Sequence, residues 1–448
     1  MGLIDRLRGG QPRVAFLGID GVPYSLVRDN PDRFPNLTSL AEDGSAGPIE
    51  SIVPPESSAC WPSLTTGVNP GETGVYGFTD REVGSYDTYV PMGRDVRADR
   101  IWDRVHDEGR QATVFNVPVS FPPQRNVQRM ASGFLSPGGI EKYATPDELR
   151  STLDAVGYEK DVDPSLGHEA DKSEFVTAAH DVLEGRYRAF DHYVEADDWD
   201  LFFGVFMTPD RVNHFLFEDY ERDGEDREAF LDFYETLDEY IGNLRADLAD
   251  DVTLIVAADH GFTTLDHEVW LNTWLEQEGW LSYADDDHED LADIADETRA
   301  YSFIPGRFYI NLEGREPRGS VPESEYDETR AELKQMLLDL AGPDGEPVCD
   351  RVVEREAAFD GAHDDIAPDL VAIPNDGFDL KAGFGDQDDV FDKGSRVGMH
   401  RFDGAAMFVD DPDVTLDGEV NLFDIAPTIL DLMDVEYEAA DFDGRSLV

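Results

Sequence analysis

The stretch VAFLGIDG, residues 14–21, indicates the fold, because an unbroken apolar run ends at Asp20 and is followed at once by Gly21. Apolar runs without polar alternation are typical of strands that are buried on both faces of a parallel sheet. Similar short runs occur at 112–117, 201–207, 252–258, 370–373 and 405–409, with amphipathic stretches such as 100–108 and 229–248 between several of them. The alternation predicts an α/β fold, a doubly wound and mostly parallel sheet with helices on both faces.

Two long polar regions, near 121–198 and 280–395, interrupt this alternation. Candidate site residues occur on both sides of each region, so we expect insertions that cap the sheet rather than independent domains. Residues 1–448 are then expected to form a single domain. Trp270, Trp274 and Trp280 are interpreted as core residues, with stacking on a base as the alternative. The first ten residues, MGLIDRLRGG, are interpreted as a frayed start.

The chain is strongly acidic, since 98 Asp and Glu against 36 Lys and Arg give a formal net charge of -62. The acidic residues are spread along the whole length, which is typical of a solvating surface. At 1 M salt the Debye length of about 3 Å removes the self-repulsion of such a surface. We therefore expect a salt-adapted, halophilic source. The same field opposes nucleic acid and anionic lipid as surface partners.

The chain has two cysteines, Cys60 and Cys349, and so has no disulfide framework and no cysteine zinc cluster. A reducing cytosol is the simplest compartment for such a protein. The N-terminus has no apolar signal region, and no later stretch approaches the roughly 20 apolar residues of a membrane span. We expect a cytoplasmic protein without membrane association.

Six potential metal ligands and one hydroxyl lie in or just before the loops that follow buried runs, where open α/β sheets build their sites. Asp210 and His214 are spaced i, i+4, so both face one side if a helix begins there, although a salt-linked pair would look the same. Asp259 and His260 reach one ion only where the chain turns sharply, which Gly261 permits. The full set is Asp20, Ser57, Asp210, His214, Asp259, His260 and His400.

Carboxylate and imidazole ligands without thiolate suit Zn²⁺ best, with Mn²⁺ or Co²⁺ as alternatives. Two such ions about 3.5–4 Å apart clamp the attacking and leaving oxygens of an in-line displacement, and one of them can hold a serine as its alkoxide. Small hydroxyl residues at 57–58 precede an apparent helix start, which can hold both a nucleophile and the anion that it attacks. The set predicts phosphoryl or sulfuryl transfer.

The blocks FLGIDGV, PPESSACW, TTGVNPG, TPDRVNH, AADHGF and GMHRFDG together resemble the alkaline phosphatase superfamily. Within it they resemble the type I phosphodiesterase and nucleotide pyrophosphatase group and its archaeal phosphohydrolase or phosphomutase relatives. The resemblance implies a bridging nucleophile and two metal ions. One ion would be held by Asp210, His214 and His400, and the other by Asp20, Asp259 and His260.

In this superfamily the attacking residue lies nine positions before the Thr of a Thr-Gly pair, and Thr66 therefore implies Ser57, with Ser58 as a minor competitor. The family more often has Thr at this position, so Ser is a mild departure. Cys60 lies in a C-W-P-S stretch that is similar to a sulfatase motif, but Leu64 stands where that motif has Arg. We interpret Cys60 as a buried small hydrophobic residue.

The resemblance implies a hydrolase that cleaves a phosphodiester or pyrophosphate bond of a small phosphate ester through a phosphoseryl-type intermediate. A phosphomonoesterase or phosphomutase is the alternative, and would need an extra cation near the nucleophile. The sequence offers no clear candidate near Ser57, although Arg81 and Arg94 keep this alternative open. A catalytically silent binding protein is the third reading. Asn116 either contacts substrate or satisfies backbone groups at a strand end.

Overall fold

The computed structural model describes residues 10–137, 142–416 and 418–448, so the expected frayed start lies almost entirely outside the described residues. The largest sheet has eight strands in the order β2-β18-β9-β1-β8-β5-β6-β7. Strands β9, β1, β8, β5 and β6 are parallel neighbours, whereas β18 and β7 run antiparallel to theirs. The bounds are β1 (Arg13–Ile19), β2 (Ser45–Ile49), β5 (Ala112–Phe115), β6 (Arg129–Ala131), β7 (Ala144–Thr145), β8 (Leu201–Phe206), β9 (Val252–Ala257) and β18 (Ala405–Val409).

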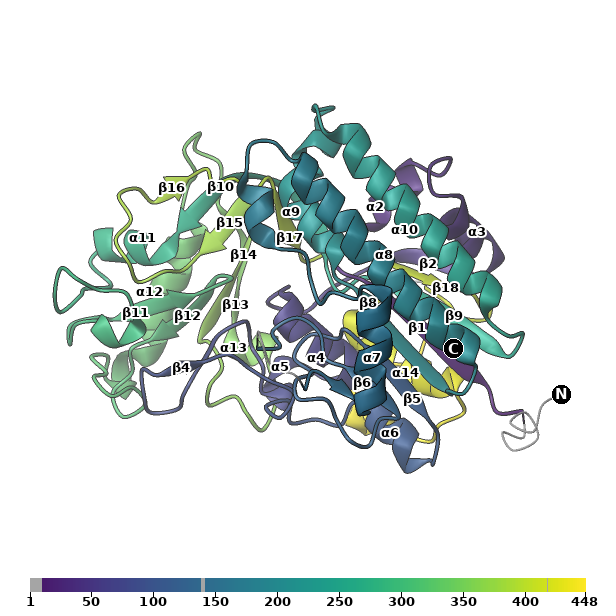
Figure 1. Ribbon diagram of the computed structural model, residues 1–448. Coiled ribbons are helices and arrows are strands. Elements are labelled where there is room, and N and C mark those ends of the chain that lie inside the picture. The colour runs from purple at the N-terminus through teal and green to yellow at the C-terminus, as the bar shows by residue number, and fades with distance from the viewer. Residues whose placement is uncertain (1–9, 138–141, 417) are drawn as a thin grey trace.

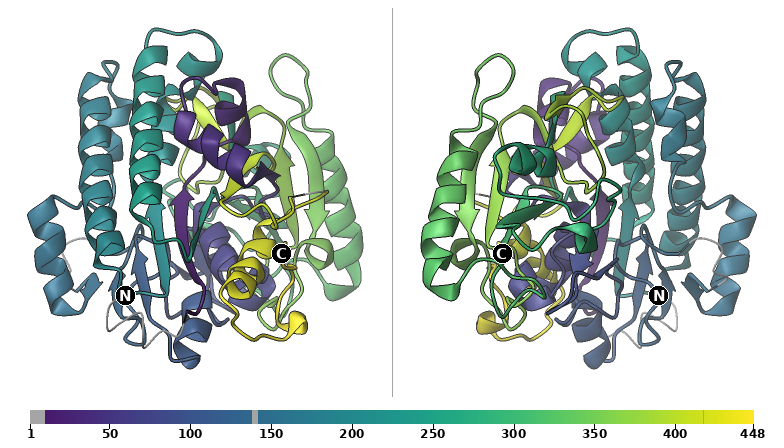
Figure 2. Two further views of the ribbon diagram at one scale, coloured as in Figure 1. Left: turned by 90° about the vertical axis from the view of Figure 1, so that its right-hand side faces the viewer. Right: turned by 90° about the vertical axis from the view of Figure 1, so that its left-hand side faces the viewer.

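Helices cover both faces of this sheet, with α8 and α10 on one side and α4, α6 and α14 on the other (Figures 1 and 2). The bounds are α2 (Tyr24–Asp29), α3 (Pro35–Asp43), α4 (Ser57–Thr66), α5 (Pro70–Thr73), α6 (Ile101–Asp107), α7 (Asp147–Val156), α8 (Ser173–Ala196), α9 (Thr208–Glu221), α10 (Arg227–Asp247) and α14 (Ile425–Leu432). The predicted doubly wound, mostly parallel fold is therefore confirmed. No helix of the described ranges combines the length and apolar character that crossing a membrane requires.

A smaller lobe lies beside the main sheet and has its own apolar core (Figure 1). Its sheet has the order β11-β12-β14-β13, and Trp274 and Trp280 are buried in the core. The predicted strand at 370–373 forms, but it belongs to this antiparallel sheet and not to the main one, which corrects its placement. The bounds are β11 (Ala300–Phe303), β12 (Arg307–Ile310), β13 (Cys349–Glu354), β14 (Leu370–Pro374), α11 (Leu271–Gln277), α12 (Tyr326–Leu338) and α13 (Arg355–Ala358).

Strand β10 (Gly261–Trp270) leads from the tip of β9 into the smaller lobe and pairs with β15 (Gly377–Lys381), β16 (Phe391–Asp392) and β17 (Gly398–Arg401). The β10–β17 register places Phe262 opposite His400. His400 therefore lies next to the end of β9, although 140 positions separate it from His260 in sequence.

Two buried ion pairs join the short hairpin of β3 (Asp80–Arg81) and β4 (Thr88–Tyr89) to the smaller lobe. Arg81 Nη1 lies 2.9 Å from Glu316 Oε1, and Arg307 Nη1 lies 2.8 Å from Asp80 Oδ1. Removing one partner of such a pair would leave a buried charge uncompensated. These contacts fix the smaller lobe against the loops that follow α4.

Candidate metal centre and nucleophile

Three candidate ligands lie at the tips of two neighbouring parallel strands. Asp20 follows β1, and Asp259 and His260 follow β9 closely, so the three side chains reach the same edge of the sheet. Nε2 of His260 lies 3.7 Å from Asp20 Oδ1 and 3.6 Å from Asp259 Oδ2. The backbone N–H of Gly21, which adopts φ +69°, donates to Asp259 Oδ1 at 3.2 Å. All three side chains are fully buried.

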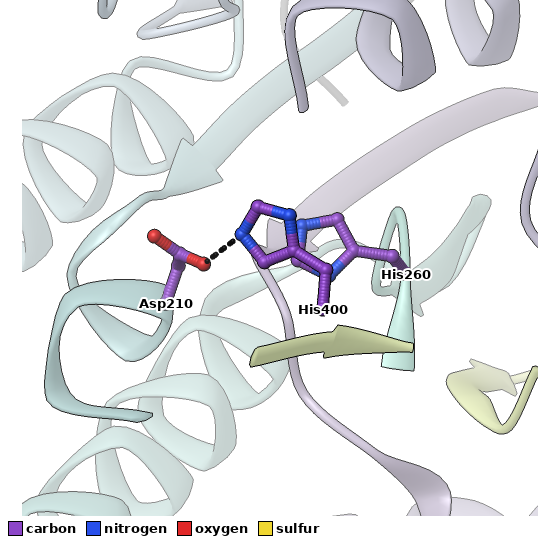
Figure 3. A group of neighbouring side chains, drawn as sticks. All are labelled: Asp210, His260 and His400. Atoms are coloured by element: carbon purple, nitrogen blue, oxygen red, sulfur yellow. Dashed lines mark ion pairs between the residues drawn. The ribbon is translucent and has the colours of Figure 1, made fainter. Parts of the chain in front are cut away.

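The other three candidate ligands come from α9 and β17. Asp210 and His214 lie one turn apart on α9, as their spacing predicts, and Nε2 of His214 lies 3.5 Å from Asp210 Oδ1. Nε2 of His400 lies 3.3 Å from the same oxygen and 3.2 Å from Nε2 of His214. Figure 3 shows the carboxylate of Asp210 directed at the ring of His400, with His260 beside it. The ring centroids of His260 and His400 are 4.0 Å apart, so the two groups adjoin.

Neighbouring groups orient these ligands. Trp61 Nε1 donates to Asp20 Oδ2 at 2.6 Å, and Arg211 Nη1 donates to Asp210 Oδ2 at 2.8 Å, which leaves the Oδ1 atoms to face the site. Nδ1 of His214 lies 2.9 Å from the Gly398 carbonyl, and Nδ1 of His260 lies 3.0 Å from the Gly261 carbonyl. Donation from Nδ1 to a carbonyl leaves the lone pair on Nε2, which is the tautomer that binds a metal.

The donor set fits two divalent cations. Asp210 Oδ1 and Asp259 Oδ2 are buried and accept no hydrogen bond within the described structure. Burial raises the pKa of Asp20 well above its usual range, and the charges of Asp259 and Asp210 raise it further. Burial likewise raises the pKa of Asp259 to about 7. Three carboxylates packed this closely require a compensating positive charge to stay ionised together.

Burial also lowers the pKa of His214, His260 and His400, which favours the neutral imidazoles that bind a metal. For Asp210 burial alone would raise the pKa. The nearby His214, His400 and Arg211 outweigh burial, however, and hold this pKa well below its usual range. The site thus contains carboxylate and neutral imidazole donors in two adjoining groups.

Ser57 is the first residue of α4, and its hydroxyl lies beside the group formed by Asp20, Asp259 and His260. Its Oγ lies 3.3 Å from Asp20 Oδ1 and 3.2 Å from Nε2 of His260. The competitor Ser58 instead donates to Glu56 Oε1 at 3.1 Å. Of the two hydroxyls, Ser57 is therefore the one that meets the candidate ligands.

Gly261 contributes to the site through close packing of the chain. Gly261 does not adopt a left-handed conformation, because its φ is not positive. A Cβ at this position would instead lie 2.2 Å from the carbonyl oxygen of Asp403. The glycine allows a close approach of the chain that carries His400, whereas Gly21 provides the left-handed turn.

Two further residues singled out in the sequence bond to groups other than the candidate ligands. Asn116 is fully buried at φ +62°, and its Nδ2 donates to the Val205 carbonyl at 3.1 Å, which favours the backbone role over a substrate contact. Cys60 is also fully buried and lies 3.3 Å from the hydroxyl of Ser51. The interpretation of Cys60 as a buried small residue is confirmed.

A small cavity of about 50 Å³ opens beside His214 and His400 and is bounded by both lobes. Arg396 and Lys381 line it, together with Glu56. A wider cleft of about 360 Å³ also reaches His400. Its walls include Pro55, Thr263, Phe378 and Phe402.

The cations that the sequence analysis considered do not reach this cavity. Arg81 is fully buried against Glu316, and the side chain of Arg94 is 74% exposed. Neither arginine belongs to the described residues that line the cavity. Sequence reasoning missed Arg396 and Lys381 because both lie in the long second polar region or just after it. It also missed Trp61. This residue follows Ser57 by four positions, and on one helix that spacing could have indicated that the two residues are neighbours.

Comparisons with solved structures agree with this fold. Phosphonoacetate hydrolase from Sinorhizobium meliloti, solved with phosphonoformate, is 17% identical and superposes with a TM-score of 0.62 over 95% of this chain and 96% of its own. Murine ectonucleotide pyrophosphatase/phosphodiesterase 5 is 14% identical, with a TM-score of 0.56 over 96% of this chain and 97% of its own. At these identities the likeness shows the fold alone. No curated protein sequence matches the chain.

The sequence itself matches the family model of type I phosphodiesterase / nucleotide pyrophosphatase over residues 14–403. This span begins in β1, ends just after β17, and contains every candidate ligand and Ser57. That match supports a phosphoester hydrolase of the phosphodiesterase or pyrophosphatase type. The chain therefore belongs to the type I phosphodiesterase / nucleotide pyrophosphatase family of the alkaline phosphatase superfamily.

Proposed function

We propose that the protein hydrolyses a phosphodiester or pyrophosphate bond of a small phosphate ester at a two-metal centre, with Ser57 as nucleophile. The observation that carries the proposal is the position of Ser57 Oγ, which lies within 3.3 Å of ligand atoms of both Asp20 and His260. A hydroxyl at a helix N-terminus is well placed to attack an anionic phosphoryl group, because the first amides of the helix face the anion.

The proposed ligands of one ion are Asp210, His214 and His400, and those of the other are Asp20, Asp259 and His260. A donor set of carboxylates and imidazoles favours Zn²⁺, with Mn²⁺ or Co²⁺ as alternatives. When bound, the ions supply positive charge that stabilises the phosphoryl oxygens and lowers the pKa of an oxygen nucleophile.

Ser57 attacks phosphorus and forms an Oγ–P bond, its hydroxyl proton passes to solvent, and the P–O bond to the leaving group breaks. Water then attacks the phosphoseryl group, which restores the Ser57 hydroxyl and releases the phosphorylated product. Two in-line displacements retain the configuration at phosphorus. Asp210 Oδ2 and Asp20 Oδ2 stay bonded to Arg211 and Trp61, which hold both carboxylates in place.

The wider cleft at His400 supports an extended substrate, because about 360 Å³ is in the range of small-molecule sites. Solved relatives support the same substrate class. An inactive variant of murine ectonucleotide pyrophosphatase/phosphodiesterase 5 was solved with AMP, and the phosphonoacetate hydrolase with phosphonoformate.

The test is hydrolysis of bis-p-nitrophenyl phosphate and p-nitrophenyl phosphate in molar KCl with Zn²⁺ or Mn²⁺. We expect the diester to be cleaved faster and Ser57→Ala to lower kcat/KM at least ~1,000-fold, as for other nucleophile deletions. Ser63→Ala is the matched control, since Ser63 is buried in the same helix and its hydroxyl has no hydrogen-bond partner within the described ranges. A preference for the monoester would favour a phosphatase or phosphomutase, and a folded, metal-loaded protein without turnover would favour a binding protein.

A further inference from the structure

The small cavity beside the candidate metal ligands is built from both lobes. His214 and His400 form one wall, and Ile304 and Pro305, from the turn between β11 and β12, belong to the smaller lobe. Its volume of about 50 Å³ is far below the several hundred Å³ of a nucleoside-sized site. The cavity therefore suits a compact group that is attached close to the reacting phosphorus.

The charged side chains of the cavity differ in the partners that they have. Lys381 forms an ion pair with Asp379 and lies 3.6 Å from Glu268. Glu56 Oε1 accepts hydrogen bonds from the Phe78 backbone N–H at 2.6 Å and from the Ser58 hydroxyl at 3.1 Å, whereas its Oε2 has no hydrogen-bond partner among the described residues. Among the residues that the structure describes, Arg396 has neither an ion pair nor a hydrogen bond to its guanidinium.

An unpaired arginine is informative in this chain. With 98 acidic against 36 basic residues, carboxylates greatly outnumber the cations with which they can pair. Arg396 lines the same cavity as His214 and His400, so its guanidinium belongs to the surroundings of the candidate ligands. A cation that lies beside the candidate ligands without a carboxylate is available to bind an anion from solution.

The backbone on both sides of Arg396 is fixed to the large lobe. The Val397 N–H donates to the carbonyl oxygen of His214 at 2.8 Å, and the Ser395 hydroxyl bonds to Nδ1 of His168. Arg396 is half-buried, and Met399 and Leu380 contribute apolar wall to the same cavity. Apolar surroundings strengthen an ionic hydrogen bond, because water screens it less.

We propose that Arg396 binds a second anionic group of the substrate, a carboxylate or a phosphate that is bonded close to the phosphorus attacked by Ser57. This inference rests on the proposed function and narrows its substrate class to esters or anhydrides with two adjacent anionic groups. The planar guanidinium can donate two parallel N–H bonds to either oxyanion, which a lysine cannot do.

The test compares three anions as ligands of the Mn²⁺-loaded Ser57→Ala protein, measured by calorimetry in molar KCl. Inorganic phosphate carries no second group, pyrophosphate carries a phosphate and phosphonoformate carries a carboxylate. We expect either pyrophosphate or phosphonoformate to bind more tightly than phosphate. Arg396→Gln should lower the affinity for that anion by roughly 10- to 100-fold, the loss typical of a charged hydrogen bond. Inorganic phosphate should change by less than about threefold, and Arg396→Lys should give an intermediate loss.

Lys393→Gln is the matched control, because Lys393 is an exposed cation of the same segment that lies outside the cavity wall. It should leave all three affinities unchanged. If Arg396→Gln weakens the binding of pyrophosphate more, the second group is a phosphate. If it weakens the binding of phosphonoformate more, the second group is a carboxylate. An equal loss for all three anions, or no loss, would overturn the inference. If the wild type hydrolyses none of the esters, the proposed function is refuted, while the calorimetric result on Arg396 still stands.

Discussion

Oγ of Ser57 lies 3.2 Å from Nε2 of His260, the imidazole whose ring stacks beside that of His400. His260 also completes a cluster with Asp210 and His400 in which all candidate ligand atoms lie within 4.8 Å. The hydroxyl therefore contacts a histidine that clusters with Asp20 and Asp259 and also with Asp210 and His400. This position, rather than the identity of the hydroxyl, is what we expect the reaction to depend on.

Ser57→Thr should therefore keep activity, because it preserves the hydroxyl at the start of α4. We expect kcat/KM within about tenfold of wild type for Ser57→Thr, against the loss of at least ~1,000-fold for Ser57→Ala. Retention of the phosphoryl group on residue 57 after acid quench, detected by mass spectrometry, would show the covalent intermediate directly. Equal inactivation by Thr and Ala would argue against a hydroxyl nucleophile at this position.

Metal binding should stabilise the fold, because Asp20, Asp210 and Asp259 repel one another without a cation. We expect two equivalents of Zn²⁺ per chain and a rise in unfolding free energy of about 2.7 kcal/mol per site when free Zn²⁺ is 100 times Kd. His400→Ala should lower the stoichiometry, measured by elemental analysis after gel filtration. His106→Ala is the control, since His106 is exposed on α6. This variant should bind as much Zn²⁺ as the wild type does.

Glu56 provides a pH test that avoids the ligands themselves. Burial raises its pKa from 4.5 to about 7, so the folded state holds a proton that the unfolded state has lost. Its stabilising contribution is present below about pH 4.5 and is lost as the pH rises through 7. The unfolding free energy of wild type relative to Glu56→Gln should thus fall by about 3 kcal/mol across this window. A difference that stays constant with pH, measured by urea unfolding, would show that folding does not shift the pKa of Glu56.

The strand tips were predictable because apolar runs of this kind become parallel neighbours, and parallel strands end at the same edge. The spacing of Asp210 and His214 likewise predicted one helical face. The strand at 370–373 was assigned to the wrong sheet, because an apolar run carries no information about its pairing partner. A short run in the antiparallel sheet of the smaller lobe is as apolar as one in the main sheet.

Arg396 could not be found from the sequence for a related reason. Its place beside His214 is fixed by tertiary contacts, such as the backbone hydrogen bond from Val397 to the carbonyl of His214, between segments that lie far apart in the chain. Residue types in a polar loop do not determine such a contact. The proposed preference for a second anionic group consequently comes from tertiary structure alone.

The acidic surface leads to a prediction about salt. Lowering KCl from 1 M to 0.1 M lengthens the Debye length from about 3 to about 10 Å, which lets the carboxylates repel one another. With a net charge of -62, we expect the melting temperature of the metal-loaded protein to fall markedly over this range. Sucrose at matched osmolarity should not replace KCl. Full folding and activity in low salt with metals supplied would exclude salt adaptation.

Trp61→Phe should weaken metal binding without unfolding the protein. The indole Nε1–H donates to Asp20 Oδ2 at 2.6 Å, and Phe would keep most of the apolar packing against Phe16 and Phe203 while removing this donor. Loss of a contact that orients a ligand typically costs 10- to 100-fold in metal affinity, and we expect a loss of that size in a chelator competition assay. Trp102→Phe is the matched control, because Trp102 is equally buried but its Nε1–H donates to Gln124. It should lower stability and leave Zn²⁺ affinity unchanged, whereas equal losses of affinity in both variants would refute a specific role for Trp61.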